Sequence, residues 1–277
     1  MKKRLLLSGL VLLMLAAITP LALAIGNESD TPSKGISVLI DGHPAALHVP
    51  LVVLDSTTYV SIRDFSMAMG ADSVIWDNGT ATVTAPNLSV TATVDNLYLV
   101  ANDRYLFTPD GCLMVNNSVM VPIRVIAKAF DAAVDWNGDT MTVSVTKGTG
   151  AITPGSVFYD STDLYWMSRI IQAEAGGESF IGQVAVGGVV MNRLADPTFP
   201  KTVHDIIFDT TYGVQFTPAY SGAIYNTPSD ECILAAKIAL DGGNTAGNSL
   251  YFASTSNCWA ARARPFAMTI GNQTFYA

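Results

Sequence analysis

Residues 169–178 read RIIQAEAGGE, a helical pattern that ends at two consecutive glycines. At about 100° per residue, Leu164, Met167 and Ile170 face one side of the helix, and Glu174 falls within the same arc. A carboxylate that faces the interior loses hydration, and the negative end of the helix dipole acts in the same direction, so both favour the protonated form. Glycosidic-bond cleavage requires such a protonated general acid. The alternative is an acid at a helix end that turns out to solvent.

The first 24 residues have the order of a secretory signal peptide. A basic start, Lys2 to Arg4, precedes an apolar run from Leu5 to Ile18, and Ala22-Leu23-Ala24 puts small residues at the cleavage positions. The run is short for a bilayer span of about 20 residues. We therefore expect cleavage before Ile25 and a chain that is secreted or associated with the cell wall. An uncleaved membrane anchor is the alternative.

Composition narrows the possible ligands. The chain has 277 residues, enough for two domains beyond the signal segment. Without the three basic residues of that segment, it carries 12 Lys and Arg against 23 Asp and Glu. This acidity argues against nucleic-acid binding, which needs clustered cations. The histidines His43, His48 and His204 form no ligand cluster, so we expect no metal and no other cofactor.

Three cysteines, Cys112, Cys232 and Cys258, show no zinc-binding spacing and no framework of several disulfides. The alternatives are a Cys232–Cys258 pair outside the cell and separate buried thiols. The chain has no Gly-x-Ser-x-Gly motif and no credible Cys–His pair, which disfavours serine and cysteine hydrolase mechanisms.

The chain divides at residues 147–162, where a small, polar stretch containing Pro154 is typical of a linker. Before it, alternating Thr and Val residues at 80–84 and 141–145 predict strands. The first half is therefore expected to be rich in β-structure.

This first half contains an internal repeat. One copy has Arg63 and Trp76, and the second has Arg124 and Trp136, which lie 61 and 60 positions further along the chain. Each copy predicts a strand, a helix, a strand and a hairpin. The two arginines could contact a ligand, but we favour structural pairing with a nearby Asp or a carbonyl.

The Val-Pro-Ile-Arg and Val-Asp-Trp-Asn elements of the second copy make residues 36–146 resemble the domain named after the N-terminus of copper amine oxidases. The resemblance implies an antiparallel sheet with packed helices, and neither copper nor catalysis. It also implies a stalk that places or tethers the protein through a cell-wall or protein ligand.

Residues 163–277 predict a helix-dominated α+β domain. Predicted helices cover the Glu174 segment and residues 180–194, 202–208 and 227–240, and predicted strands cover 250–252, 267–270 and 274–276. The helix at 180–194 is apolar nearly all round, which indicates the buried centre of the domain, and its glycines leave room for close backbone approach. In the last helix, Thr227 is the expected cap and Pro228 the first helical residue.

Several short motifs follow one another in the order seen in the SleB-type cell-wall hydrolases: Ala173–Glu178, Gly182–Val186, Val190–Arg193, Gln215–Thr217, Ser249–Phe252, Thr269–Gly271 and Phe275–Tyr276. By these motifs, residues 164–277 resemble that family. The resemblance implies a lysozyme-like domain that cleaves the glycan chains of peptidoglycan, notably spore cortex, with Glu174 as the general acid. Two positions depart from the family pattern, Ala253-Ser254 in place of Asn-Pro and Gln273 in place of His. Neither touches the acid, and both concern substrate contacts.

Five residues are candidate substrate contacts: Gln215, Phe216, Thr217, Tyr251 and Trp259. The amide and the hydroxyl suit hydrogen bonds to a sugar, and the three aromatic rings offer faces for stacking. Core packing is the alternative for the aromatic residues, and Trp259 falls in a loop-like stretch. Arg262 and Arg264 could meet carboxylates of the wall, with solvated charge as the default alternative.

As a hypothesis, Glu174 protonates the oxygen between N-acetylmuramic acid and N-acetylglucosamine. If its anion then takes a proton from the sugar's 6-hydroxyl, the reaction is lytic transglycosylation; if it activates water, the reaction is hydrolysis. Glu178, Asp196 and Asp209 are conceivable second acids, but the double glycine should swing Glu178 away to the entry of the next helix. We therefore favour transglycosylation. Competing hypotheses are a non-catalytic wall-binding lectin and a surface stalk or scaffold.

Overall fold

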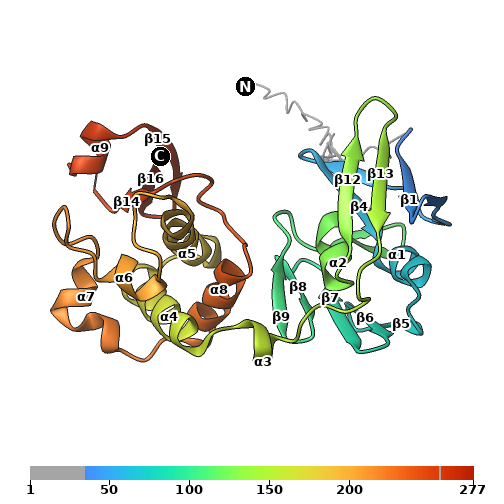
Figure 1. Cartoon of the computed structure of the whole chain (residues 1–277), viewed down its shortest axis with the longest axis horizontal. Coiled ribbons are helices and arrows are strands. Elements are labelled where there is room, and N and C mark those ends of the chain that lie inside the picture. The colour runs from blue at the N-terminus through green and yellow to red at the C-terminus, as the bar shows by residue number, and fades with distance from the viewer. Residues whose placement is uncertain (1–34, 256) are drawn as a thin grey trace, which may run out of the picture.

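The computed structural model describes residues 35–255 and 257–277, which form two lobes joined by a single segment (Figure 1). The predicted signal peptide, residues 1–24, lies outside the described residues. Within the described part of the chain, no helix is both long enough and apolar enough to cross a membrane.

The two repeat copies adopt the predicted order of strand, helix, strand and strand. The first copy consists of β4 (Thr57–Ser61), α1 (Ile62–Met69), β5 (Ser73–Asp77) and β6 (Thr80–Ala85). The second copy consists of β11 (Ser118–Pro122), α2 (Ile123–Ala129), β12 (Ala133–Asn137) and β13 (Thr142–Thr146). Strands β4 and β11 pair antiparallel, with Val60 opposite Val121. The rings of Phe65 and Phe130 meet edge to face with centroids 6.2 Å apart, so equivalent parts of the two copies share one core.

The remaining strands of this N-terminal lobe complete three sheets. They are β1 (Ser37–Ile40), β2 (His43–Pro44), β3 (Val52–Leu54), β7 (Leu88–Thr93), β8 (Tyr98–Ala101), β9 (Arg104–Phe107) and β10 (Leu113–Val115). The sheets run β12-β13-β1-β2, β10-β11-β4-β3 and β5-β6-β7-β8-β9. The lobe therefore has three sheets where the resemblance implied one, and β1 pairs parallel with β13. That pair joins the first and last strands of the lobe, a contact that no local pattern specifies.

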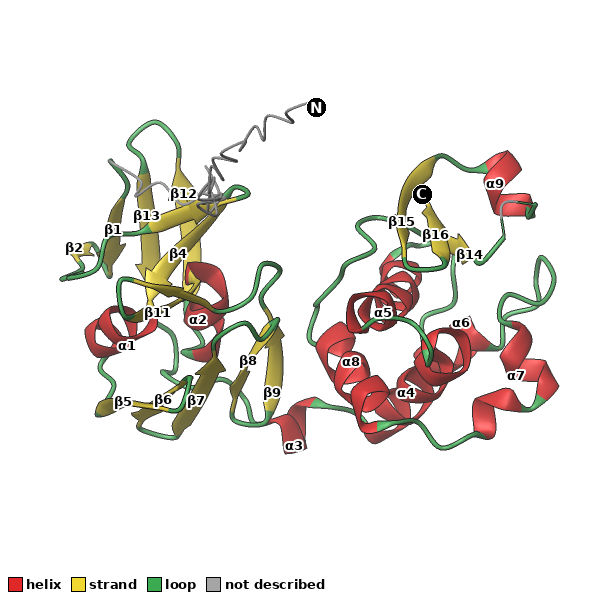
Figure 2. Cartoon of the chain, turned by 180° about the vertical axis from the view of Figure 1, so that it is seen from behind, coloured by secondary structure: helices red, strands yellow, loops and turns green. Residues whose placement is uncertain are grey.

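The C-terminal lobe is helical and ends in a small sheet, as predicted for an α+β domain (Figure 2). After α3 (Gly155–Phe158) in the connecting segment come α4 (Ser161–Ala175), α5 (Phe180–Ala195), α6 (Val203–Ile207), α7 (Thr217–Ser221), the 3-10 helix η1 (Ala223–Tyr225), α8 (Asp230–Leu240) and α9 (Trp259–Ala263). Strands β14 (Tyr251–Ala253), β15 (Phe266–Ile270) and β16 (Gln273–Tyr276) form an antiparallel sheet in the order β14-β16-β15.

Helix α5 lies at the centre of this lobe, as its apolar sequence predicted. Val184, Val186 and Val190 are completely buried. A Cβ atom at Gly187 would lie 2.6 Å from the Cβ of Ala239 in α8, closer than real side chains approach. The glycine therefore allows α5 and α8 to pack with their backbones in close contact.

Two local expectations for this lobe were wrong. Helix α8 is capped by Ser229, whose hydroxyl accepts from the N–H of Cys232, so Pro228 precedes the cap and is not the first helical residue. The loop-like stretch around Trp259 is one turn of helix, capped by the Cys258 sulfur, which accepts from the N–H of Ala261 at 3.3 Å. Helices of one turn carry too few residues for a periodic pattern.

The cysteines are free thiols in the structure. Cys112 and Cys232 are buried, and Cys258 is half-buried. The Sγ of Cys232 lies 3.5 Å from the side-chain oxygen of Gln183, within the core of the C-terminal lobe. Of the two alternatives, the structure shows separate thiols.

The two lobes touch along β8 and β9. Tyr98, Tyr105 and Phe107 of the N-terminal lobe pack against the apolar core of the C-terminal lobe. The rings of Tyr98 and Phe180 lie 6.4 Å apart between centroids. The N-terminal lobe therefore contributes side chains to the packing of its neighbour.

Candidate active site

Helix α4 is held in place at its start and along one face. The side chain of Asp160 accepts from two backbone N–H groups of the first turn, at 2.8 and 3.0 Å. These groups have no partner within the helix, so the cap stabilises its first turn. Met167, Ile170 and Ile171 are completely buried on the face predicted to be apolar.

Glu174 lies in the last turn of α4, next to this apolar face. Its side chain is half-buried, and burial raises the pKa of the carboxyl to about 7. Desolvation disfavours the charged form, as the helical pattern predicted. The alternative, a carboxyl that turns out to bulk solvent, is not what the structure shows.

Gly176, at the end of α4, is needed for space and not for a left-handed backbone conformation. Gly176 has φ −62° and ψ −16°, which any residue can adopt. A Cβ atom at this position would collide with the side chain and carbonyl of Gln172. The Oε1 of Gln172 accepts from the N–H of Ser229 at 2.8 Å. Gly176 therefore gives Gln172 the space to join the end of α4 to the start of α8.

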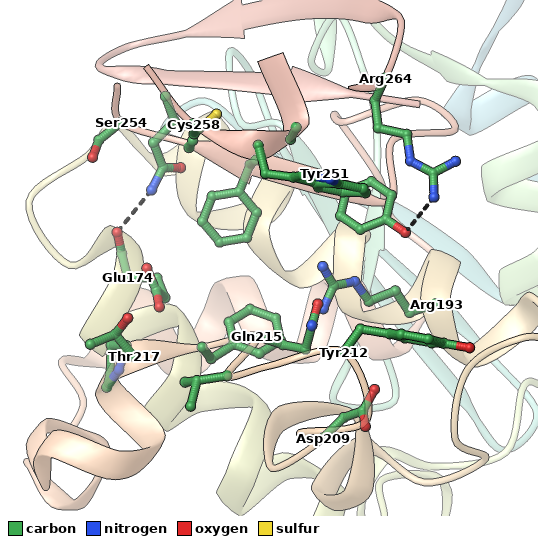
Figure 3. Close-up of a pocket in the computed structure, with 18 of the residues that line it drawn as sticks. Glu174, Arg193, Asp209, Tyr212, Gln215, Thr217, Tyr251, Ser254, Cys258 and Arg264 are labelled. Carbon is green, nitrogen blue, oxygen red and sulfur yellow. Dashed lines mark hydrogen bonds between the residues drawn. The ribbon is translucent and has the colours of Figure 1, made fainter. Parts of the chain in front are cut away.

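Glu174 lines a groove with a volume of about 1410 Å³. The walls come from the end of α4, the turn before α6, the loop between α6 and α7, and the segment from β14 into α9. Figure 3 shows Glu174 and Thr217 on one side of this groove, and Arg193, Tyr212 and Tyr251 on the other. The fold brings all five predicted substrate contacts to this groove: Gln215, Phe216, Thr217, Tyr251 and Trp259.

The three predicted contacts on the α6–α7 loop differ in exposure. Phe216 is 1% exposed and packs against Phe252, with ring centroids 6.1 Å apart, so it supports the floor and offers no free face. Gln215 donates from Nε2 to the carbonyl of Gly213 at 3.0 Å, which shapes the loop. Thr217 is exposed at the first turn of α7.

Tyr251 and Trp259 form one wall together with Arg264. Their rings meet edge to face with centroids 5.5 Å apart. The Cζ of Arg264 lies 4.8 Å from the Tyr251 centroid and 5.3 Å from that of Trp259. Its Nη2 donates to the Tyr251 hydroxyl at 3.1 Å. Trp259 is 59% exposed, so its ring is free to stack on a ligand.

The three conceivable second acids lie in different settings. Glu178 accepts from the backbone N–H of Asn272 at 3.0 Å and from its side-chain amide at 3.1 Å, so it holds the β15–β16 turn. The helix entry expected for Glu178 is capped instead by Ser179. Asp196 accepts from a backbone N–H two residues on, at 2.8 Å, and does not line the groove. Asp209 lines the groove and makes a similar turn contact at 2.9 Å.

Two further side chains reach the site. Gln273 was expected to concern substrate contacts and not to touch the acid, which was wrong because it contacts the backbone of Glu174. Arg193 was not predicted as a site residue. Gln273 is 4% exposed and donates from Nε2 to the backbone carbonyl of Glu174 at 2.9 Å. The two residues are 99 positions apart, so no local pattern reveals the contact. Arg193 is 4% exposed in the last turn of α5 and donates from Nε to the carbonyl of Leu250 at 2.7 Å. The sequence signal that could have identified Arg193 as a site residue is its charge on the otherwise apolar helix α5.

The arrangement suits acid catalysis on an extended polar ligand. A carboxyl that titrates near neutral pH lies on the wall of a long groove with aromatic and hydrogen-bonding side chains. Across residues 35–255 and 257–277, no group of three His, Cys, Asp or Glu side chains could hold a metal ion.

Both lobes match known protein families. The cell wall hydrolase family model matches residues 177–276, beginning three residues after Glu174. The copper amine oxidase N-terminal domain model matches residues 39–145.

Several curated relatives are spore cortex-lytic enzymes. That of Halalkalibacterium halodurans is 35% identical over 122 residues, which cover 42% of this chain and 35% of the relative. That of Bacillus cereus is 34% identical over 122 residues, which cover 42% of this chain and 45% of the relative. That of Oceanobacillus iheyensis is 33% identical over 143 residues, which cover 50% of this chain and 46% of the relative. The chain therefore spans less than half the length of these relatives.

Two solved structures are also similar. The catalytic domain of the germination-specific lytic transglycosylase SleB from Bacillus anthracis is 32% identical, with 45% of this chain and all of that chain covered and a TM-score of 0.40. The catalytic domain of the Bacillus cereus SleB protein is 32% identical, with 47% of this chain and all of that chain covered and a TM-score of 0.39.

Proposed function

We propose that this chain cleaves the glycan strands of peptidoglycan with Glu174 as general acid. Its C-terminal lobe belongs to the cell wall hydrolase family, and its N-terminal lobe belongs to the copper amine oxidase N-terminal domain family. The observation that carries the proposal is the half-buried Glu174 carboxyl, with a pKa of about 7, on the wall of a groove able to seat a polysaccharide. A general acid works best when its pKa lies near the working pH.

The bond cleaved is the one between N-acetylmuramic acid and N-acetylglucosamine. Glu174 donates its proton to the bridging oxygen while the bond from that oxygen to the anomeric carbon breaks and positive charge develops on the sugar ring. Gln273 holds the backbone carbonyl of Glu174, which keeps the end of α4 in place. Gln215, Thr217, Tyr251 and Trp259 bind the sugars by hydrogen bonds and stacking.

We favour a lytic transglycosylase over a hydrolase. The carboxylate of Glu178 is held by two hydrogen bonds from Asn272, and that of Asp209 is held by the backbone N–H of Thr211. Glu174 is therefore the acid that we assign as base in the second step. The anion of Glu174 takes the proton of the muramic 6-hydroxyl as that oxygen bonds to the anomeric carbon. The acid is thereby regenerated, and the product carries a 1,6-anhydro end.

The rest of the chain exports the catalytic domain and places it at the cell wall. We take residues 1–24 as a cleaved signal peptide, 36–146 as the stalk, 147–162 as the linker and 163–277 as the catalytic domain. The protein is exported to the cell wall, where the stalk places the groove near its substrate through a wall or protein ligand. Spore cortex is the substrate suggested by the relatives, whose names describe cortex lysis.

A gel containing purified peptidoglycan tests the proposal. The wild-type protein should clear the gel, and Glu174→Gln should not. Asp230→Asn, an exposed acid at the start of α8, is the matched control and should clear normally. Wall binding without clearing by the wild type would favour the non-catalytic lectin. Mass analysis of the digest should show anhydro-muramic ends, and reducing ends alone would indicate a hydrolase.

A further inference from the structure

Two guanidinium groups approach the ring of Tyr251 within the groove. The Cζ of Arg193 lies 5.3 Å from the ring centroid, and the Cζ of Arg264 lies 4.8 Å from it. Both arginines line the groove, and Figure 3 shows Tyr251 between them. Like charges repel, so two cations gathered at one tyrosine need a compensating anion or full solvation.

Neither arginine has a carboxylate within 4.0 Å among residues 35–255 and 257–277. Arg264 is exposed, and water can solvate its charge. Arg193 is 4% exposed, and its Nη1 has no hydrogen-bond partner in the described part of the chain. Buried arginines are almost always paired, because burying a lone charge is costly.

The surroundings of Arg193 do not neutralise it. Burial lowers the pKa of its guanidinium to about 10, so the group is still charged at neutral pH. The rings of Phe199 and Phe216 lie 5.1 Å from its Cζ and give partial compensation. Asp209 attracts it from beyond salt-bridge distance.

The charge at this end of the groove is opposite to that of the protein. The chain has a formal net charge of −8, yet two unpaired cations meet at Tyr251. The acid at this end of the groove, Asp209, accepts from the backbone N–H of Thr211 at 2.9 Å and forms no salt bridge with either arginine. Charge complementarity therefore favours an anionic group on the ligand at this end.

We propose that Arg193 and Arg264 form a receptor for a carboxylate of the substrate, with Tyr251 as the spacer between them. Planar guanidinium groups match a carboxylate with two parallel hydrogen bonds, which gives orientation as well as affinity. This inference rests on the proposed peptidoglycan substrate. Peptidoglycan offers such a carboxylate from two sources, the lactyl group of a muramic residue without its peptide and the stem peptide itself.

Arg262 provides a matched control. It is exposed and lies two residues from Arg264, so its removal changes the net charge equally. Its Nη2 donates to the side chain of Asn257 at 3.0 Å, and it does not line the groove. A receptor at Tyr251 requires Arg264 and not Arg262.

The test measures binding in a Glu174→Gln background, where no cleavage interferes. Calorimetry uses three glycan oligomers of equal length: chitin oligomers without carboxylates, muramic-containing oligomers with free lactyl carboxylates, and the same oligomers with stem peptides. Arg264→Gln should weaken binding of a carboxylate-bearing oligomer on the order of tenfold and leave the chitin oligomer unchanged. The oligomer that loses affinity identifies the source. Arg262→Gln should change none of the three.

Arg193→Lys tests the buried partner. Lysine keeps the positive charge but cannot make the planar guanidinium contact with a carboxylate. Because Arg193 also donates to the carbonyl of Leu250, thermal unfolding checks that the variant is folded. If a variant loses affinity equally for all three oligomers, or if Arg264→Gln loses no affinity for any of them, the receptor is overturned. Glycan cleavage by the wild type would still leave the proposed function standing. A Glu174→Gln parent that binds none of the oligomers, together with a wild type that clears no peptidoglycan, overturns both.

Discussion

Arg104 and Asp241 form a bidentate ion pair between the two lobes, with Nε–Oδ2 at 2.8 Å and Nη2–Oδ1 at 2.7 Å. The two side chains are 7% and 1% exposed. The Asp241 carboxylate also accepts from Lys128 Nζ at 2.7 Å and from the Tyr159 hydroxyl at 3.1 Å. The N-terminal lobe, the segment between the lobes and the end of α8 therefore meet at one carboxylate, which holds one lobe against the other.

We expect Asp241→Ala to lower the free energy of unfolding by about 3–5 kcal/mol, because it leaves Arg104 buried without its partner. Chemical denaturation measures the change. Asp205→Ala removes an exposed partner of His204 and should change stability little. A loss for Asp241→Ala as small as that of this control would show that the pair does not join the lobes in solution.

The pH dependence of cleavage should follow the protonation of Glu174. Its pKa of about 7 means that the acid form is abundant below neutral pH and declines above it. The rate at saturating substrate should therefore fall about tenfold per pH unit above 8. Initial rates on solubilised peptidoglycan between pH 5 and 9 provide the measurement. A rate that keeps rising to pH 9 would contradict a general acid at this position.

Stability gives an independent test of the same carboxyl. Its pKa is raised on folding, so the folded state binds more protons than the unfolded state, and stability is lost as pH rises through about 7. Glu174→Gln removes this dependence. The free energy of unfolding of the variant minus that of the wild type should therefore be larger at pH 8.5 than at pH 5, by about 2–3 kcal/mol. An effect of the substitution that is the same at both pH values would argue against desolvation at Glu174.

Glu178→Ala separates a structural role from a catalytic one. Loss of the two hydrogen bonds from Asn272 should cost about 1–3 kcal/mol of unfolding free energy. Because the β15–β16 turn is followed by Gln273, which holds Glu174, the rate should fall moderately with an unchanged pH profile. Complete loss of cleavage in a protein of normal stability would instead identify Glu178 as a second catalytic acid.

The elements that sequence predicted well depend on near neighbours along the chain. The helix that bears Glu174 and the apolar helix α5 follow from periodicity within some fifteen residues, and the two repeat copies follow from short motifs that recur about 60 positions apart. The interior face of Glu174 was predictable for the same reason, because helical spacing places it beside Ile170. The one-turn helix at Trp259 and the cap at Ser229 were missed or misplaced, since short elements carry too little pattern to set their boundaries.

The sequence by itself determined that an acid at the end of a helix would lose water, and which aromatic and polar residues were candidates to surround it. Tertiary structure decided the rest, because the decisive contacts join distant parts of the chain. Glu178 meets Asn272 across 94 positions and Arg104 meets Asp241 across 137. Such pairs form only when the tertiary fold brings the two residues together. Their burial and charge compensation therefore exist only in the packed structure.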